Sequence, residues 1–194
     1  TAYKLTKYHP NKKILVLEKE KEVAQHQTSH NSGVIHSGIY YKPGSYKAKN
    51  CVDGRRELVQ FARDYKIAHD ICGKLIVATH ESELAHMNKV FANGLANGVE
   101  DMEMIDARRI QEIEPYCVGI AGIRVGCTGI IDYLQVAKKY AELIEAGNNG
   151  SKVMTSQHVT GFERGTDQTV VITKTSRFTG KHIITTSGLQ ADRM

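Results

Sequence analysis

A short apolar run that ends in an acid, followed by a long polar loop, constrains the fold of this chain more than any other feature. Residues 14–17 (Ile-Leu-Val-Leu) predict a buried strand, and Glu18 follows it directly. In a dinucleotide-binding unit, a carboxylate at this position accepts a hydrogen bond from a ribose 2′-hydroxyl. The competing interpretation is a solvated acid at the start of the charged run 18–22. The pattern therefore favours a nucleotide-binding α/β fold.

The polar loop at 18–44 shows little periodicity, and a loop of that length inside a compact domain usually serves a function. Gly33 and Gly38 would let the backbone approach a ligand closely. Hydroxyl and amide groups suited to the carbonyls and phosphates of a planar cofactor occur at Thr28, Ser29, Asn31 and Ser32. The alternative is a polar surface loop without a ligand.

Composition and charge exclude several classes of protein. The 194 residues are 41% hydrophobic and 24% charged, as in an ordinary soluble globular protein. No apolar run approaches the ~20 residues that cross a bilayer, and the first ten residues lack the apolar core of a signal peptide. The net charge of +5 is spread along the chain, which argues against a nucleic-acid partner because such proteins cluster their basic residues.

Cysteine and histidine patterns indicate a reducing compartment and no metal site. None of the four cysteines forms a Cys-x-x-Cys pair, and Cys72 and Cys117 are expected to be buried thiols. His26, His30 and His36 lie close in sequence. The spacing of His30 and His36 and the lack of carboxylates or cysteines nearby argue against a metal centre.

Helices and strands alternate along the rest of the chain, which predicts an α/β or α+β fold. Ser45 and Asp132 are the expected N-caps of two long helices. Helices are expected over 1–8, 45–66, 81–97, 107–114 and 132–146. Strands are expected over 14–17, 73–79, 102–105, 119–125, 152–156, 159–163, 169–175 and 182–186. A strand-to-turn-to-helix transition is expected at 187–192.

The segment 30–41 (His-Asn-Ser-Gly-Val-Ile-His-Ser-Gly-Ile-Tyr-Tyr) resembles the flavin loop of the D-amino-acid-oxidase-like FAD oxidoreductases, in the form found in the L-2-hydroxyglutarate dehydrogenase/oxidase group. Segments 72–78, 114–116 and 128–133 resemble the same group. The resemblance implies a partial FAD-binding Rossmann-like domain, at 1–66 and 132–194, with an inserted mixed-sheet substrate domain at 67–131. It also implies that a Gly-x-Gly-x-x-Gly phosphate loop and a C-terminal portion lie outside this chain.

The resemblance implies FAD as the cofactor and gives individual residues a role. His36 would act as acid or base beside the flavin, or would only hydrogen-bond to it, with the base then in the C-terminal portion outside this chain. Tyr41 and Lys74 would face a substrate carboxylate, although a structural role for Lys74 is an equal alternative. Val159 would bind adenine through its backbone. The other cofactor contacts would come from Glu18, Lys19, Thr28, Ser29, His30, Asn31, Ser32, Gly33, Val34, Ser187, Gly188 and Leu189.

The implied reaction oxidises L-2-hydroxyglutarate, a small 2-hydroxy dicarboxylate, to 2-oxoglutarate by hydride transfer to flavin N5. Oxygen or a quinone would accept the electrons, and a histidine can take the hydroxyl proton near neutral pH. The alternatives are a related oxidoreductase acting on glycine, sarcosine or glycerol-3-phosphate, and a cofactor-free chain without turnover. A bacterial protein would be cytoplasmic or peripherally bound at the inner membrane, and a eukaryotic one mitochondrial.

Overall fold

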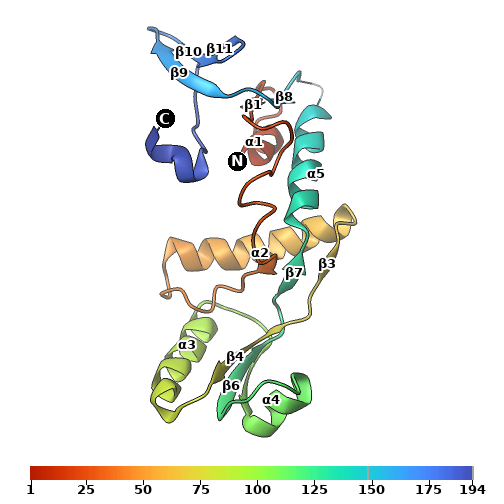
Figure 1. Cartoon of the computed structure of the whole chain (residues 1–194), viewed down its shortest axis with the longest axis vertical. Helices are drawn as coiled ribbons and strands as arrows, with labels where there is room; N and C mark the ends of the chain where they lie inside the picture. Colours follow the sequence, from red (N-terminus) through yellow and green to blue (C-terminus); the bar gives the residue numbers. More distant parts are fainter. Residues whose placement is uncertain (148, 194) are drawn as a thin grey trace. The chain divides into compact units, whose positions relative to one another are not determined.

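In the computed structural model, which describes residues 1–147 and 149–193, the chain forms two compact units (Figure 1). Unit 1 consists of Thr1–His30 and Ala137–Met194, and unit 2 of Asn31–Val136. The division falls inside the first turn of helix α5 (Tyr133–Glu145). The functional domains expected at 1–66, 67–131 and 132–194 stay a prediction, and their boundaries differ from those of the compact units.

The predicted first strand is present in unit 1 as β1 (Leu15–Leu17), paired in parallel with β8 (Lys152–Met154). Helix α1 (Ala2–Tyr8) precedes β1, and Tyr3 stacks on Tyr140 of α5 with ring centroids 4.7 Å apart. The buried Ser151 hydroxyl accepts a hydrogen bond from the Ile14 amide at 2.9 Å, which joins the starts of the two strands. The parallel pair therefore presents its carboxyl ends, with Glu18, at one edge.

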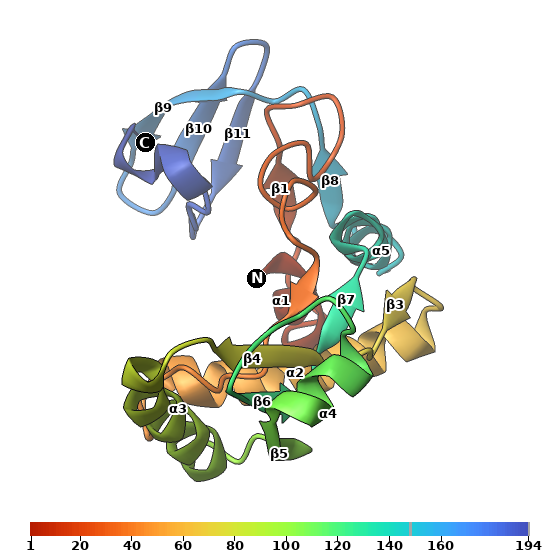
Figure 2. The same ribbon diagram turned by 60° about the horizontal axis from the view of Figure 1, so that its bottom comes forward.

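The C-terminal part of unit 1 is an antiparallel sheet in the order β11-β10-β9, seen clearly in Figure 2. Its strands are β9 (Val159–Arg164), β10 (Thr169–Thr173) and β11 (Arg177–Gly180), and η2 (Gly188–Arg193) follows. The strand predicted at 182–186 is wrong, because the last strand comes earlier. Strand β10 ends at Thr173, two residues before the end predicted at 175. The Thr173 hydroxyl accepts a hydrogen bond from the Ser176 amide at 3.0 Å, in the turn that follows.

One sheet of unit 2 consists of three short antiparallel strands in the order β2-β7-β3. They are β2 (Val34–Ile35), β7 (Gly129–Ile131) and β3 (His69–Asp70), and their lengths of two or three residues explain why no periodicity predicted them. Helix α2 (Tyr46–Asp64) connects β2 to β3 along the chain. The predicted cap is confirmed, because the Ser45 hydroxyl accepts a hydrogen bond from the Ala48 amide at 3.2 Å.

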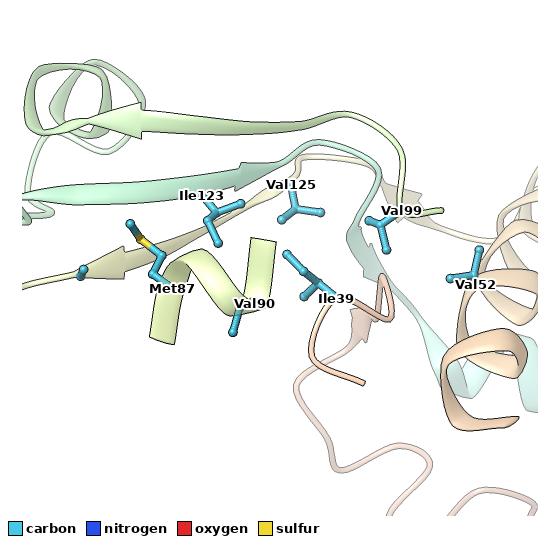
Figure 3. Close-up of a cluster of buried hydrophobic side chains, with 8 residues drawn as sticks. Ile39, Val52, Met87, Val90, Val99, Ile123 and Val125 are labelled. Carbon is cyan, nitrogen blue, oxygen red and sulfur yellow. The ribbon is translucent and has the colours of Figure 1, made fainter. Parts of the chain in front are cut away.

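A second antiparallel sheet of unit 2 has the order β4-β6-β5, formed by β4 (Lys74–Ala78), β6 (Ala121–Val125) and β5 (Met102–Asp106). The connecting helices are η1 (Glu81–Glu83), α3 (Leu84–Ala96) and α4 (Ala107–Ile113). The main core joins this sheet to α3, α2 and the polar loop (Figure 3). Its buried members are Ile39, Val52, Ala78, Met87, Val90, Val99, Ile123 and Val125. The mixed α/β class predicted from the sequence is confirmed.

Candidate functional site

Glu18 lies where the nucleotide-binding hypothesis requires it, directly after β1 on the parallel pair. Its amide donates to the Met154 carbonyl at 2.9 Å, and its carbonyl accepts from the Gln157 amide at 2.8 Å, so the β1–β8 pairing holds the backbone. One carboxylate oxygen, Oε1, accepts the Glu20 amide at 2.9 Å. Within the described residues the second oxygen has no partner, which leaves an acceptor for a ribose hydroxyl.

The loop that follows Glu18 in unit 1 binds largely to itself. Glu20 Oε1 lies 2.8 Å from His26 Nε2, and this hydrogen bond lowers the pKa of Glu20. His30 Nδ1 lies 2.9 Å from the His26 carbonyl and 3.0 Å from Ser29 Oγ. Ser29 also donates to the Ala24 carbonyl. Ser29 and His30 thus form hydrogen bonds within their own exposed loop. Lys19 and Thr28 of the same loop are exposed as well.

The other predicted cofactor residues of unit 1 lie beyond β8. Val159 opens β9, an edge strand, so part of its backbone faces away from β10. Gly188 has φ +56, and a Cβ there would meet no atom within 4 Å. Leu189 is 90% exposed, and the Gln190 amide donates to the Ser187 carbonyl at 3.0 Å. The segment 187–189 is therefore an open turn leading into η2.

The part of the polar loop in unit 2 is tied to strand β7. The Gly33 carbonyl accepts the Ile131 amide at 2.9 Å, and Val34 and Ile35 pair with Ile130 and Gly129. Gly33 has φ +70, a conformation that favours glycine, and a Cβ would lie 3.3 Å from the Ile131 carbonyl oxygen. Its amide donates to Asn31 Oδ1 at 2.7 Å. Asn31 and Ser32 remain exposed before this anchor.

His36 is the exposed residue within the otherwise buried segment 35–39. Ile35, Ser37 and Ile39 are each at most 1% exposed, whereas the His36 side chain is exposed. The His36 carbonyl accepts a hydrogen bond from the Cys51 thiol at 3.5 Å. Gly38 has φ +92 and packs closely on Val52 of α2. The buried neighbours fix the backbone that presents the His36 ring.

Lys74, at the start of β4, lies over the ring of Tyr40, with Nζ 4.6 Å from the ring centroid. Burial lowers the pKa of Lys74 below its ordinary value of 10.5, and the neighbouring Cys127 and Cys51 thiols oppose that shift. Among the described residues, no acidic side chain pairs with this ammonium. Tyr41 makes a backbone contact instead, because its carbonyl accepts from the Asn97 side chain at 2.8 Å.

The sequence did not predict that Tyr40, Cys51 and Cys127 act on Lys74, or that Arg55 acts on the two thiols. Burial raises the pKa of the Cys51 thiol, against the opposing charges of Arg55 and Lys74, and it raises that of Cys127 as well. Arg55 is 8% exposed although it lies on α2. A charged residue one turn after Cys51, on the helix face that carries Val52, was the sequence feature that could have indicated it.

Arg55, itself buried, forms an ion pair with the half-exposed Glu100. Its guanidinium binds the Glu100 carboxylate and donates to the Cys127 carbonyl at 3.4 Å, while Nε is buried without a partner in the described residues. Arg56 donates to the same carboxylate at 2.8 Å. Burial disfavours the charged form of Glu100, but the Arg56 hydrogen bond and the charges of both arginines outweigh it and lower the pKa of Glu100.

The predicted site residues thus fall in both units. Unit 1 carries Glu18, Lys19, Thr28, Ser29, His30, Val159 and the turn 187–189, and unit 2 carries Asn31, Ser32, Gly33, Val34, His36, Tyr41 and Lys74.

All four cysteines are free, and Cys72 is exposed, so its predicted burial is wrong. In the part of the chain that the structure describes, no three His, Cys, Asp or Glu side chains are grouped to hold a metal ion. None of the described helices has the length and apolar character to span a bilayer.

Comparison with known proteins identifies the family. The family model described as FAD dependent oxidoreductase matches residues 1–194. The chain belongs to the FAD-dependent oxidoreductase family. It is 41% identical over 194 residues to L-2-hydroxyglutarate dehydrogenase of Indibacter alkaliphilus, covering 100% of this chain and 48% of that protein. It is also 41% identical to the human mitochondrial L-2-hydroxyglutarate dehydrogenase, covering 96% of this chain and 42% of that one.

Solved structures support the same FAD-dependent oxidoreductase fold. Glycine oxidase from Geobacillus kaustophilus matches 99% of this chain and 52% of its own, with a TM-score of 0.84 and 16% identity. The FAD-bound L-alpha-glycerophosphate oxidase from Mycoplasma pneumoniae matches 90% of this chain and 46% of its own, with a TM-score of 0.74 and 26% identity. The chain spans about half the length of the curated relatives it matches.

The residues present fit the flavin nucleotide of the family. Glu18 keeps one carboxylate oxygen at the end of a parallel strand. Gly33 and Gly38 hold positive φ angles in the loop that carries the family pattern. The donors and the open turn at 187–189 add groups suited to phosphates and ring carbonyls.

Proposed function

We propose that this chain contributes to an FAD-dependent enzyme that oxidises L-2-hydroxyglutarate to 2-oxoglutarate. The observation that carries the proposal is the 41% identity to L-2-hydroxyglutarate dehydrogenases over essentially the whole chain. The structural neighbours named as oxidases of glycine or glycerophosphate share far less sequence, 16% and 26%. That difference favours a hydroxy-acid substrate over the amine and glycerol-phosphate alternatives.

FAD, when bound, supplies the redox chemistry by accepting a hydride. In unit 1, Glu18 would hold the adenosine ribose, the Val159 backbone the adenine, and the residues 187–189 a phosphate. Lys19, Thr28, Ser29 and His30 would complete these contacts, Ser29 and His30 after giving up hydrogen bonds that they make within the loop. In unit 2, the segment Asn31 to Val34 would lie along the ring system.

His36 would accept the hydroxyl proton of the substrate. Its ring is exposed, while its backbone is fixed between the buried residues Ile35 and Ser37. Oxidation of a secondary alcohol requires loss of both the hydroxyl proton and the α-hydrogen, and a positioned base contributes about 10²–10⁴-fold to such a step. Tyr41 and Lys74 would face the substrate carboxylates. Oxygen or a quinone would receive the electrons.

The first experiment is a flavin absorbance spectrum of the purified protein, taken anaerobically before and after L-2-hydroxyglutarate is added. We expect the bands of oxidised flavin, and their bleaching by this acid. A colourless protein would contradict FAD binding. A yellow protein bleached by glycine, sarcosine or glycerol-3-phosphate but not by L-2-hydroxyglutarate would contradict the substrate. Adding oxygen or a soluble quinone to the bleached protein then identifies the acceptor.

A His36→Gln variant separates the two roles of the histidine. If His36 is the base, the rate of anaerobic flavin reduction falls by about 100-fold or more while the oxidised flavin spectrum is kept. A fall of less than about threefold would mean that His36 only hydrogen-bonds and that the base lies elsewhere. The matched control is His86→Gln, on α3 in the same unit, which should leave the rate unchanged.

The cellular location follows the source of the protein. The relatives from eukaryotes carry the word mitochondrial in their names. A eukaryotic protein would therefore reside in the mitochondrion, and a bacterial one in the cytoplasm or at the inner membrane. Peripheral membrane association would suit a quinone acceptor, and fractionation of cells with and without a high-salt wash tests it.

A further inference from the structure

Lys74 is a half-buried cation without a counter-ion. It opens β4, its ammonium lies over the Tyr40 ring, and among the described residues no carboxylate pairs with it. Other partly buried basic groups of unit 2 have such a partner: Arg55 binds Glu100, and Arg124 binds Asp101 at 2.9 Å. Removing an ammonium from water costs free energy that an anion can return. The position is therefore suited to an anion from outside the chain.

The groups around Lys74 also favour the binding of an anion from outside the chain. The two groups whose charges act on it are the thiols of Cys127 and Cys51, and burial raises the pKa of both, so neither serves as a ready counter-ion. The Tyr40 ring limits access from one side, and its electron-rich face adds a favourable contact for the cation. A lysine ammonium is a compact point charge, and one held in this way can bind a carboxylate.

Two observations relate this cation to His36, the proposed base. The thiol donates to the His36 carbonyl at 3.5 Å and also feels the charge of Lys74. Tyr40, whose ring lies under the Lys74 ammonium, also follows the exposed His36 by four residues in the same loop. A short ligand with a hydroxyl at one end and a carboxylate at the other has the functional groups to engage both.

We propose that Lys74, over Tyr40, holds the carboxylate remote from the reacting carbon and so selects 2-hydroxy dicarboxylates over 2-hydroxy monocarboxylates. This proposal rests on the proposed function, because it assigns one end of that substrate. It goes beyond a general substrate contact by naming the carboxylate and the property that Lys74 controls. Substrates without a distal carboxylate would not use the group.

The test compares Lys74→Met, Lys74→Arg and the control Lys49→Met, an exposed lysine on α2. L-2-hydroxyglutarate and L-2-hydroxybutyrate are the substrates for FAD-loaded protein. We expect Lys74→Met to raise KM for the dicarboxylate about 10- to 100-fold, as for a lost hydrogen bond to a charged group, with little change in kcat. Lys74→Arg should recover part of the loss, and the slower oxidation of the monocarboxylate should not change. Equal losses for both acids, or the same loss in Lys49→Met, would overturn the proposal.

A binding readout separates this proposal from the proposed function. Glutarate, which has two carboxylates and no hydroxyl, should slow alkylation of Cys51 and Cys127 in FAD-loaded protein, as measured by mass spectrometry. Exposed Cys72 serves as the internal control. Protection that is lost in Lys74→Met supports the carboxylate site even if L-2-hydroxyglutarate is not oxidised. Oxidation of L-2-hydroxyglutarate with unchanged KM and unchanged protection in Lys74→Met overturns the carboxylate site alone.

Discussion

Residues 27–39 of the polar loop fall into two halves that are built differently. Residues 27–30, in unit 1, are exposed, and the side chains of Ser29 and His30 bond to carbonyls and hydroxyls of their own loop. Residues 31–39, in unit 2, enter strand β2 and then the core, where Ile39 is fully buried. The first half is held by local hydrogen bonds, and the second by packing and strand pairing.

This difference shows how a motif of small and polar residues can place one side chain accurately. In the second half, Ile35, Ser37, Gly38 and Ile39 are all buried, although only Val34 and Ile35 lie in a strand. His36 and Tyr40, on either side of the buried residues 37–39, are exposed. The apolar residues of the motif supply rigidity, and the intervening residues supply chemistry.

The largest effect is expected from removing the anchor of the second half. Ile39→Ala should lower the free energy of unfolding of unit 2 by about 2–5 kcal/mol, because it deletes a buried side chain from the main core. Urea denaturation followed by hydrogen exchange at Ile123 and Val125 measures it. The control is Val118→Ala, a residue 74% exposed in the same unit, with an expected change within about 0.5 kcal/mol. Equal effects would mean that the loop is not anchored by the core.

Local chemistry decided which elements the sequence could predict. The helices that begin at Tyr46 and Tyr133 follow side-chain caps, and the Asp132 carboxylate accepts the Gln135 amide at 3.0 Å as expected. Strands β2, β3 and β7 have no local pattern because pairing between distant segments creates them. The His182–Thr186 segment shows the opposite failure, since its residues favour a strand but the hairpin has already ended.

The candidate site was predictable where a family pattern runs along the chain and not where side chains meet across it. Glu18, His36 and Lys74 could be named from their motifs. The pairing of Lys74 with Tyr40, and the burial of Arg55 against Glu100, depend on contacts between residues far apart in sequence. A buried arginine on an otherwise amphipathic helix was visible in the sequence, but its partner was not.

An ion pair also stabilises unit 2, where Arg55 of α2 binds Glu100. Glu100→Gln should destabilise unit 2 by about 2 kcal/mol, less than the 3–5 kcal/mol for a fully buried pair, because the Glu100 side chain is 48% exposed. The pKa of Glu100 is lowered from its ordinary value of 4.5. Its contribution is therefore full above pH 4.5 and is lost as the pH falls through the lowered folded value.

Denaturation at a series of pH values between neutral and strongly acidic measures this contribution. The wild-type protein should lose its advantage over Glu100→Gln only on the acidic side. Glu112→Gln, which breaks exposed pairs with Arg108 and Arg109, is the matched control, with an expected change within about 0.5 kcal/mol. An advantage that persists unchanged in strong acid would show that the Glu100 charge is not the cause.

The smallest effect compares one serine from each half of the loop. Ser37 is 1% exposed, and its hydroxyl accepts the Ile39 amide at 3.4 Å. Ser37→Ala should cost about 1 kcal/mol, because it leaves that buried amide without its partner while the bond itself is long. Ser29→Ala should cost less than about 0.5 kcal/mol, since water can replace its contacts in an exposed loop. Hydrogen exchange of the Ile39 amide is the direct measurement for Ser37→Ala. If Ser29→Ala costs more stability than Ser37→Ala, the hydrogen bonds within the first half stabilise the loop more than core packing stabilises the second half. The contrast between the halves would then lie in exposure alone.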